Sequence, residues 1–370
     1  MTYYEIKDLI PTSRALTALY AFLQSLKSIT DRKEVIVPTL CCPSIVEVIF
    51  LSDFLPVFCD IDPITFTICT SDIKTRLTKD TAAILLIYLF GHSIDINMVH
   101  NILRGYHRIY LIEDVAQSLG GKVNKLLMGT SGDATIFSFT QGKILDIGNV
   151  GGLYVKDERL KDRCIKILES MPSKVNNNTY KLLSLSHRNL YHAGIDLLKA
   201  NDITEPINIM KTYQYLYKNL YLYKCEVSNK QYYCKLQDGL SRLETMNQNR
   251  HDKANILRKV VEVYPELFKH FSINLDTGVI WRFSFLCVSS KIAVEFTSYM
   301  RSMRLHVSNH YWPSHTLFGS YEQLKVSRDV SSKIVNLWVD NSVDYAYIHD
   351  YNLAIDNFAA MNRKEAVYAN

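Results

Sequence analysis

The chain has 370 residues, of which 48% are hydrophobic and 21% charged, with only 14 Gly and 9 Pro. This composition excludes disordered and fibrous classes, and the length suggests about two domains. The 42 Lys and Arg and the 37 Asp and Glu leave a formal net charge of +5. The basic residues are spread along the chain, so we do not expect nucleic acid as the main partner.

The sequence also argues against a membrane segment and a secretory signal. The apolar runs at 35–40 and 82–90 are shorter than the roughly 20 residues that span a bilayer. Residues 1–5 lack the basic start of a signal peptide, so we expect a cytoplasmic protein. The eight cysteines form no C-x-x-C pair and have no His at zinc-ligand spacing, which predicts free thiols and no metal site.

The first 160 residues predict alternating helices and strands. Thr12 or Ser13 is expected to cap a helix with apolar residues between Ala15 and Leu23. We expect strands at 35–38, 55–59, 82–88, 109–112, 134–139 and 151–155, and helices at 44–51, 72–77 and 96–103. Such alternation is typical of a parallel sheet with helices on both faces.

The second half of the chain is less regular. Residues 161–229 are predicted to be helical, and the tyrosines at odd positions between 213 and 223 fit a strand or one helix face equally well. After Leu240 a long helix leads to predicted strands at 278–288 and 305–307 and helices at 292–303 and 331–337. We therefore predict a large α/β domain over 1–238 and a small α+β domain over 239–370.

Polar residues that follow successive strands are the candidates for chemistry, because ligands of parallel α/β sheets bind beyond the carboxyl ends of the strands. The segments to consider are 38–43, 60–62, 90–92 and 114–117. Phosphate-loop, dinucleotide and zinc-hydrolase motifs are absent from the sequence. What remains is Asp114 and Gln117 after one strand, Ser138 inside the next and Lys143 in the following turn.

A buried carboxylate at Asp114 needs a cation beside it. Pyridoxal phosphate supplies one, because its protonated ring nitrogen pairs with an Asp while its aldehyde forms a Schiff base with a Lys. An opposite charge at contact distance shifts such pKa values by roughly 1–3 units. Asp114 and Lys143 therefore predict a pyridoxal-phosphate site.

Several segments, in this order and spacing, resemble the DegT/StrS-type pyridoxal-phosphate-dependent sugar aminotransferases. They are 35–38, 56–63, 91–92, 112–120, 132–139, 142–143 and 151–152. The resemblance implies a fold type I PLP-transferase, in which a large domain has a mostly parallel central sheet flanked by helices and a smaller α+β domain follows. It covers most of residues 10–157 and the C-terminal half more loosely.

The resemblance also implies roles for individual residues. Lys143 looks like the Schiff-base lysine, Asp114 like the partner of the pyridine nitrogen and Gln117 like a neighbour of the ring hydroxyl. The cofactor phosphate would be bound by Ser138, by the N–H groups of Ser13, Arg14 and Ala15 at a helix N-terminus, and by Asn229, which would reach the neighbouring subunit.

Substrate contacts are predicted from polar and aromatic groups near the expected site, which suit a sugar or nucleotide. The candidates are His92, Asn309, Trp312 and His315. Two departures from the family pattern stand out: Ser13 replaces a usual glycine, and Cys42 lies where many members stack an aromatic side chain on the cofactor ring.

By this resemblance we expect a homodimeric aminotransferase with shared active sites, acting on a keto group of a nucleotide-linked sugar with glutamate as amino donor. Surface-polysaccharide and secondary-metabolite sugars are both plausible products. One alternative is a sugar dehydratase or other lyase, although family dehydratases lack the lysine that this chain has at Lys143. The other is a non-catalytic regulatory or partner subunit, which the departures at Ser13 and Cys42 would fit.

Overall fold

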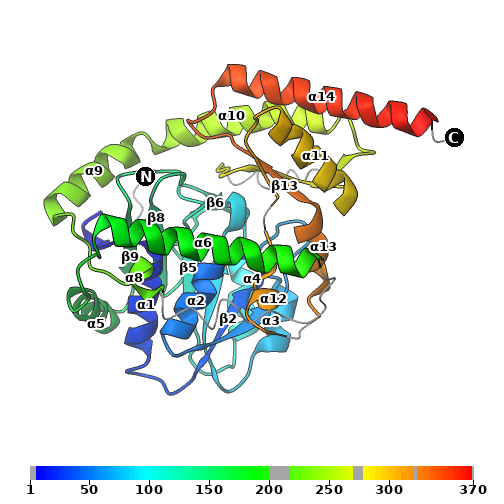
Figure 1. Ribbon diagram of the computed structural model, residues 1–370. Helices are drawn as coiled ribbons and strands as arrows, with labels where there is room; N and C mark the ends of the chain where they lie inside the picture. The colour runs from blue at the N-terminus through cyan, green and yellow to red at the C-terminus, as the bar shows by residue number, and fades with distance from the viewer. Residues whose placement is uncertain (1–5, 201–216, 270–277, 310, 321–322, 369–370) are drawn as a thin grey trace.

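The computed structural model describes residues 6–200, 217–269, 278–309, 311–320 and 323–368. These residues form a seven-stranded sheet, a four-stranded sheet and a two-stranded ribbon, with helices packed around them (Figure 1). The ribbon consists of β6 (Lys122–Val123) and β7 (Leu126–Leu127). Short 3-10 helices, η1 (Ile6–Asp8) and η2 (Leu89–Gly91), complete the first half.

The large sheet has the strand order β1-β9-β8-β5-β4-β2-β3. Its strands are β1 (Ile10–Thr12), β2 (Glu34–Pro38), β3 (Leu55–Cys59), β4 (Thr81–Ile87), β5 (Tyr110–Asp114), β8 (Ala134–Phe139) and β9 (Val150–Val155). The five strands from β3 to β8 run parallel, and β9 is antiparallel to both β8 and β1. The predicted α/β class with a mostly parallel sheet is therefore confirmed.

Apolar cores lie on both faces of this sheet, which explains the continuous apolar runs of its central strands. The surrounding helices are α1 (Ala15–Leu26), α2 (Pro43–Leu51), α3 (Thr70–Arg76), α4 (Ile96–Leu103), α5 (Glu158–Glu169), α6 (Asn177–Ala200), α8 (Lys218–Tyr221) and α9 (Asn229–Ser241). One core includes apolar residues of α1 and α2, and the other includes residues of α4 and α9. Helix α6 crosses the front of the molecule in Figure 1 and packs against the first core through Leu183 and Leu190.

The C-terminal half has its own sheet and its own core. Its elements are α10 (Leu243–Val261), β10 (Phe268–Lys269), β11 (Phe283–Cys287), α11 (Ser290–Ser302), β12 (Val307–Ser308), α12 (Ser314–Leu317), α13 (Lys325–Lys333), β13 (Ile334–Leu337) and α14 (Tyr345–Tyr368). The sheet is antiparallel in the order β10-β11-β13-β12, and α10 and α14 lie side by side at the top of Figure 1. The predicted boundary between 238 and 239 falls inside α9 and stays a prediction.

The structure corrects two predictions in this half. The helix expected at 331–337 is wrong, because α13 ends at Lys333 and the next four residues form β13. This strand pairs with both β11 and β12, so the sheet satisfies its backbone groups. The strand expected at 278–288 is shorter, with its paired part at Phe283–Cys287.

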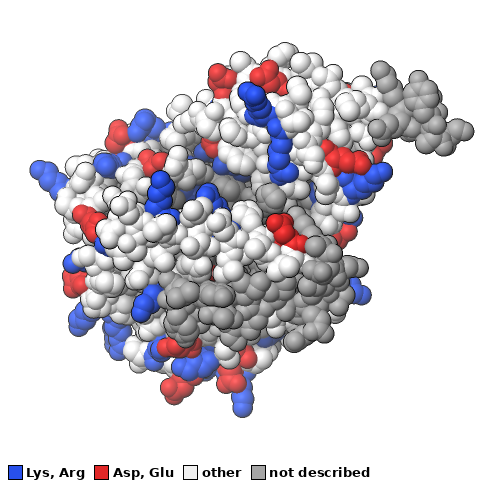
Figure 2. Space-filling view, viewed as in Figure 1, with Lys and Arg blue, Asp and Glu red and all other residues white. Residues whose placement is uncertain are grey.

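The tyrosine-rich segment is only partly described. Tyr221 belongs to helix α8 and Tyr217 is its N-cap, whereas Tyr213 and Tyr215 lie outside the described residues. Within the described ranges, no helix has both the length and the apolar character needed to cross a bilayer. Figure 2 shows Lys and Arg interspersed with Asp and Glu over the face that is viewed.

Candidate functional site

Asp114 and Lys143 come together beyond the carboxyl ends of two neighbouring parallel strands. Asp114 is the last residue of β5, is 6% exposed and accepts a hydrogen bond from the Ala116 N–H at 2.8 Å. Lys143 lies in the turn that follows β8, and each of the two groups shifts the pKa of the other. Parallel strands direct their following loops to one edge of the sheet, which explains why residues 29 positions apart meet.

Burial has opposite effects on these two groups. It raises the pKa of the Asp114 carboxyl, against the lowering effects of the Ala116 N–H and the Lys143 charge. It lowers the pKa of the Lys143 amine; the Arg282 charge adds to this lowering, and Asp114 opposes it. The two side chains interact electrostatically, yet no direct ion pair joins them among the described residues.

Several contacts hold the turn that carries Lys143. Gly142 has a φ of +81°, a conformation that glycine adopts without strain, and the Lys143 N–H donates to the Thr140 carbonyl at 3.1 Å. Trp281 Nε1 donates to the Gly142 carbonyl at 2.8 Å, and Lys143 Nζ lies 5.4 Å from the Trp281 ring centre. Arg250 donates to the Lys143 carbonyl at 3.3 Å. The C-terminal half therefore helps to position the lysine.

The cross-strand register aligns Ser138 with the start of α1. Ser138 in β8 lies opposite Gly151 in β9, and Gly151 lies opposite Thr12 in β1. A Cβ atom at Gly151 would lie 2.4 Å from the Arg14 carbonyl carbon and 2.6 Å from the Ala15 nitrogen. Only glycine lets the helix start approach β9 so closely. Because opposite residues of an antiparallel pair point to one face, Ser138 faces the side on which α1 begins.

The start of α1 carries no side-chain cap, so the prediction that Thr12 or Ser13 caps it is wrong. The N-cap is Arg14, in extended backbone. Both hydroxyls act as donors instead: Thr12 Oγ1 donates to the Arg14 carbonyl at 2.9 Å, and Ser13 Oγ to the Tyr223 carbonyl at 2.5 Å. The first N–H groups of a helix have no acceptor within it, so an uncapped start such as this one suits an anion.

A buried carboxylate connects α2 to the segment that holds Ser13. Glu47 is fully buried in α2, accepts a hydrogen bond from the Tyr221 hydroxyl, and has its two oxygens 2.9 and 3.0 Å from His187 Nε2. Tyr221 lies two residues before Tyr223, whose carbonyl accepts from Ser13. This network explains how α6 and α8 are held beside the starts of α1 and α2.

Gln117 and Cys42 also lie at this edge of the sheet. Gln117 Oε1 accepts from the Phe90 N–H at 2.7 Å, which stabilises Phe90 at a φ of 59°. Cys42 is the exposed N-cap of α2, without a side-chain cap hydrogen bond, and its thiol interacts electrostatically with Lys143. The role of Gln117 beside a ring hydroxyl stays a prediction.

Two predicted substrate contacts, His92 and His315, lie in the core. His92 is fully buried, with its ring 5.3 Å from that of Phe66 and 6.4 Å from that of Phe90. His315 is also fully buried, and its Nδ1 lies 2.6 Å from Thr39 Oγ1. Burial lowers the pKa of His315 to about 4, so the ring is neutral at neutral pH. Neither ring is therefore exposed on the surface of the site.

The remaining predicted residues, Asn309, Trp312 and Asn229, have other contacts in the structure. Asn309 accepts a hydrogen bond from Arg301 at 2.8 Å, and the half-buried Trp312 packs against the first apolar core. Asn229 is exposed at the start of α9 and lines a separate cavity of about 410 Å³ together with Lys161. Their roles stay predictions.

Trp281, Arg250 and Arg282 were not predicted from the sequence as residues of the site. Arg282 forms a buried ion pair with Asp340 at 2.5 Å, and its guanidinium lies 4.5 Å from the Trp281 ring centre. Arg250 is 3% exposed and donates to the Trp281 carbonyl at 3.1 Å. No local motif marks these residues, because only the packing of the C-terminal half brings them to Lys143.

No metal site accompanies this arrangement in the residues that the structure describes, since they contain no group of three or more His, Cys, Asp or Glu that could hold an ion. The site presents an amine at Lys143, a carboxylate at Asp114 and the uncapped starts of α1 and α2.

Comparison with known proteins identifies the family. The model of the DegT/DnrJ/EryC1/StrS aminotransferase family matches residues 1–189, which is half of the 370-residue chain. The chain belongs to the DegT/DnrJ/EryC1/StrS aminotransferase family. The matched region contains Asp114, Ser138 and Lys143, so the resemblance inferred from the motifs is confirmed.

Individual members of the family match over shorter stretches. GDP-perosamine synthase of Vibrio cholerae is 31% identical over 165 residues, 45% of this chain and 44% of that protein. GDP-perosamine synthase of Escherichia coli O157:H7 is 34% identical over 153 residues, 41% of this chain and 42% of that protein. The chain thus matches less than half the length of these relatives.

The fold match extends over nearly the whole chain. The structure of NtdA from Bacillus subtilis with its cofactor PMP bound superposes with a TM-score of 0.71, over 95% of this chain and 73% of that one. The two sequences are 18% identical, so this match concerns the fold. It includes the C-terminal half, which the family model does not reach.

Proposed function

We propose that this protein is a pyridoxal-phosphate-dependent aminotransferase that transfers an amino group to a keto group of a nucleotide-linked sugar. The observation that carries the proposal is the pairing of Asp114 and Lys143: a buried carboxylate and an amine of lowered pKa act on each other without a direct ion pair. Membership of an aminotransferase family supports it.

The residues present fit this cofactor. A carboxylate that is 6% exposed and lacks an ion-pair partner among the described residues is stabilised by a cation, which a protonated pyridine nitrogen provides. The uncapped start of α1 and the side chain of Ser138 lie on one face of the sheet and suit a phosphate. The PMP-bound relative of the same fold agrees with this choice.

Each residue of the site would have a separate role toward the cofactor. Asp114 would hold a proton on the ring nitrogen, Lys143 would attach the cofactor covalently, and Ser138 with the first N–H groups of α1 would bind its phosphate. Bound pyridoxal phosphate supplies an electron sink for the carbon that loses its proton. The lowered pKa of Lys143 favours the neutral amine, which would take up and return that proton as a general base.

The proposed sugar substrate and amino donor are inferred from the family to which the chain belongs. GDP-perosamine synthases are among the relatives of this chain, which supports a nucleotide-linked keto-sugar and a place in polysaccharide biosynthesis. Glutamate is the proposed amino donor. By the family resemblance we also propose a homodimer with shared active sites, in which Asn229, exposed at the start of α9, reaches the neighbouring subunit.

The test is the visible absorption spectrum of the purified protein with pyridoxal phosphate, before and after glutamate is added. We expect a band of lysine-bound cofactor that glutamate converts to the pyridoxamine form. In Lys143→Ala this band is absent before any amine is added, turnover is abolished and the fold is retained by circular dichroism. The matched control is Lys291→Ala on α11, whose side chain is 81% exposed.

Three results would contradict the proposal. Full turnover by Lys143→Ala would remove the lysine from the mechanism. If the protein binds the cofactor in the lysine-bound form but glutamate never converts it, the lyase alternative replaces transamination. Failure to bind the cofactor at all would favour a regulatory or partner subunit, the alternative that the departures at Ser13 and Cys42 left open.

A further inference from the structure

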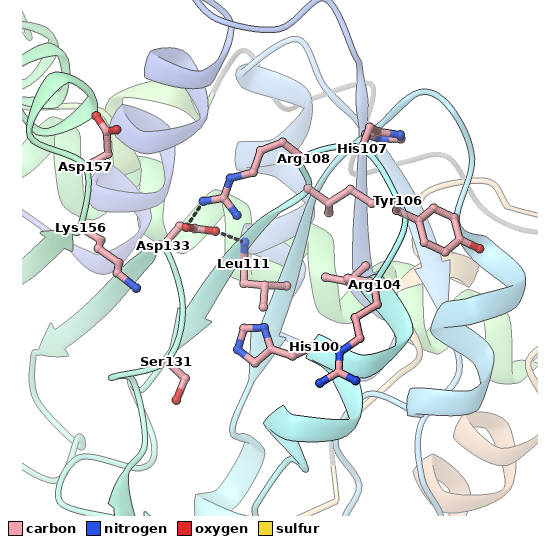
Figure 3. Close-up of a pocket in the computed structure, with 12 residues that line it drawn as sticks. His100, Arg104, Tyr106, His107, Arg108, Leu111, Ser131, Asp133, Lys156 and Asp157 are labelled. Atoms are coloured by element: carbon pink, nitrogen blue, oxygen red, sulfur yellow. Dashed lines mark hydrogen bonds and ion pairs between the residues drawn. The ribbon is translucent and has the colours of Figure 1, made fainter.

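A second cavity lies at the opposite end of the large sheet from Asp114. It has a volume of about 590 Å³ and is lined by residues of α4, of the loop after it and of the segments that follow β9 (Figure 3). Strand β5 connects the two places, because Leu111 lines the cavity while Asp114, three residues later, belongs to the candidate active site. At about 3.3 Å per residue the two are roughly 10 Å apart along the strand.

Positive charge is concentrated on the walls of this cavity. Arg104 and Arg108 reach it from the segment after α4, Lys156 from the end of β9, and the rings of His100 and His107 also line it. Figure 3 shows Lys156 approaching from one wall and Arg104 and His100 from the other. Tyr106, which is 42% exposed, adds an aromatic surface.

The two carboxylates of the cavity are already engaged. Asp133 accepts from Arg108 through one oxygen and from the Leu111 N–H at 2.9 Å through the other. Asp157 is the N-cap of α5, where Oδ1 accepts from the N–H groups of Arg159 and Leu160 at 2.9 and 3.0 Å. Neither carboxylate forms an ion pair with Arg104 or Lys156 among the described residues.

Arg104 and Lys156 are therefore two exposed cations that face one cavity without a carboxylate partner in the described part of the chain. A local explanation exists for Arg104, which is the C-cap of α4, where a cation stabilises the negative end of the helix. This explanation does not apply to Lys156, which follows strand β9 and does not end a helix. Cations that reach one cavity from two separate elements are typical of an anion-binding site.

We propose that this cavity binds a small phosphate-bearing molecule, with Arg104 and Lys156 as its main ligands and the Arg108–Asp133 pair as its fixed floor. The volume lies in the range of about 300–1,000 Å³ that is common for organic ligands, so the site can hold more than the phosphate group. Because it lies at the other end of β5 from Asp114, the ligand is distinct from the cofactor and the substrate of the active site.

The test is calorimetric titration of the cofactor-loaded protein, in a buffer free of phosphate, with inorganic pyrophosphate and with ADP in separate runs. We compare the unmodified protein with the double variant Arg104→Gln and Lys156→Gln. The control carries Arg242→Gln and Lys291→Gln, which removes the same charge from exposed residues elsewhere. The binding readout involves no turnover, so it is independent of the proposed transamination.

We expect at least one probe to bind, and the cavity variant to weaken that binding by at least tenfold, because each charge-assisted hydrogen bond to a phosphate contributes strongly. The control variant should bind as the unmodified protein does. Binding that survives in the cavity variant would place the probe elsewhere, such as the active site, and would overturn the proposal. So would the failure of both probes to bind.

Discussion

Two neighbouring carboxylates in β5 show how position decides the role of a residue. Glu113 is fully buried and accepts hydrogen bonds from the Tyr88 hydroxyl and from the N–H groups of Gly129, Ser131 and Gly132. Its charge is satisfied by the protein itself. Asp114 points to the other side of the sheet and accepts a hydrogen bond from one N–H, which is why it remains available for a cation.

The first prediction concerns Asp114→Asn. The amide keeps the size of the side chain but loses the charge that would hold a proton on the ring nitrogen, so we expect the protein to retain cofactor while its rate falls. An opposite charge shifts such a pKa by roughly 1–3 units, which corresponds to a loss of about 10- to 1,000-fold. Cofactor absorbance and single-turnover rates with glutamate measure the two effects separately. A variant as fast as the unmodified protein would remove Asp114 from this role.

The second prediction concerns His315 and the pH dependence of the free energy of unfolding. Its pKa is about 4 in the folded protein, below the value of about 6.5 for a free His. Between these pH values the unfolded chain binds a proton that the folded chain does not, so the free energy of unfolding decreases as the pH falls from 6.5 to 4, by up to about 3 kcal/mol. We expect His315→Gln to show a weaker pH dependence in urea unfolding.

The control for this measurement is His349→Gln, because His349 is exposed on α14. A change in the pH dependence of unfolding that is seen in His315→Gln but not in His349→Gln is specific to the buried histidine. If the free energy of unfolding depends on pH in the same way for His315→Gln and for the unmodified protein, His315 does not titrate as its burial implies.

At the scale of elements, the start of α1 depends on its contact with β9. The N–H groups of this helix start can face an anion because no side chain caps them and because Gly151 allows backbone to touch backbone. The family resemblance pointed to a glycine before Arg14, where this chain has Ser13. The close approach is provided instead by a glycine on the facing strand.

The third prediction is that Gly151→Ala weakens cofactor binding. The added Cβ would lie 2.4 Å from the Arg14 carbonyl carbon, so the helix start has to move away from Ser138. We expect the dissociation constant of pyridoxal phosphate, measured by absorbance titration, to rise by about tenfold or more, because aligned hydrogen bonds to a charged group are each worth about 1.5–3 kcal/mol. Unchanged affinity, with the variant folded, would show that α1 does not bind the phosphate.

At the scale of the whole molecule, the two halves are joined by hydrogen bonds from buried or half-buried groups. The Ser314 N–H donates to the Thr39 carbonyl at 2.7 Å, and Asp60 accepts from the N–H groups of Val326 and Ser327 at 3.0 and 2.8 Å. Asp60 follows β3 and so was a candidate for chemistry. The structure shows that it caps α13 of the C-terminal half.

The fourth prediction is that Asp60→Ala loosens this contact. Loss of a helix cap costs about 1 kcal/mol, and here the cap comes from the other half, so we expect faster hydrogen exchange at the start of α13 as well as lower stability. Asp157→Ala is the matched control, because Asp157 caps α5 within its own half. It should cost similar stability without exposing α13. Equal exchange at α13 in both variants would contradict the prediction.

Much of the large sheet could be predicted from the sequence. The bounds expected for β3, β8 and α4 agree with the structure, because their apolar patterns end at polar or turn residues that close each element locally. The C-terminal half was harder. Residues 334–337 form a strand because β11 and β12 lie on either side of them, and neither partner is nearby in the sequence.

For the candidate site, the sequence alone determined the family and the residue types at the carboxyl edge. The succession of strands along the chain and the residues of the turns that follow them are local signals. Only the tertiary structure decided which groups share the site. It placed His92 and His315 in the core, and it brought Trp281, Arg250 and Arg282 to Lys143. Burial and charge depend on contacts between distant segments, so they follow from packing and not from spacing along the chain.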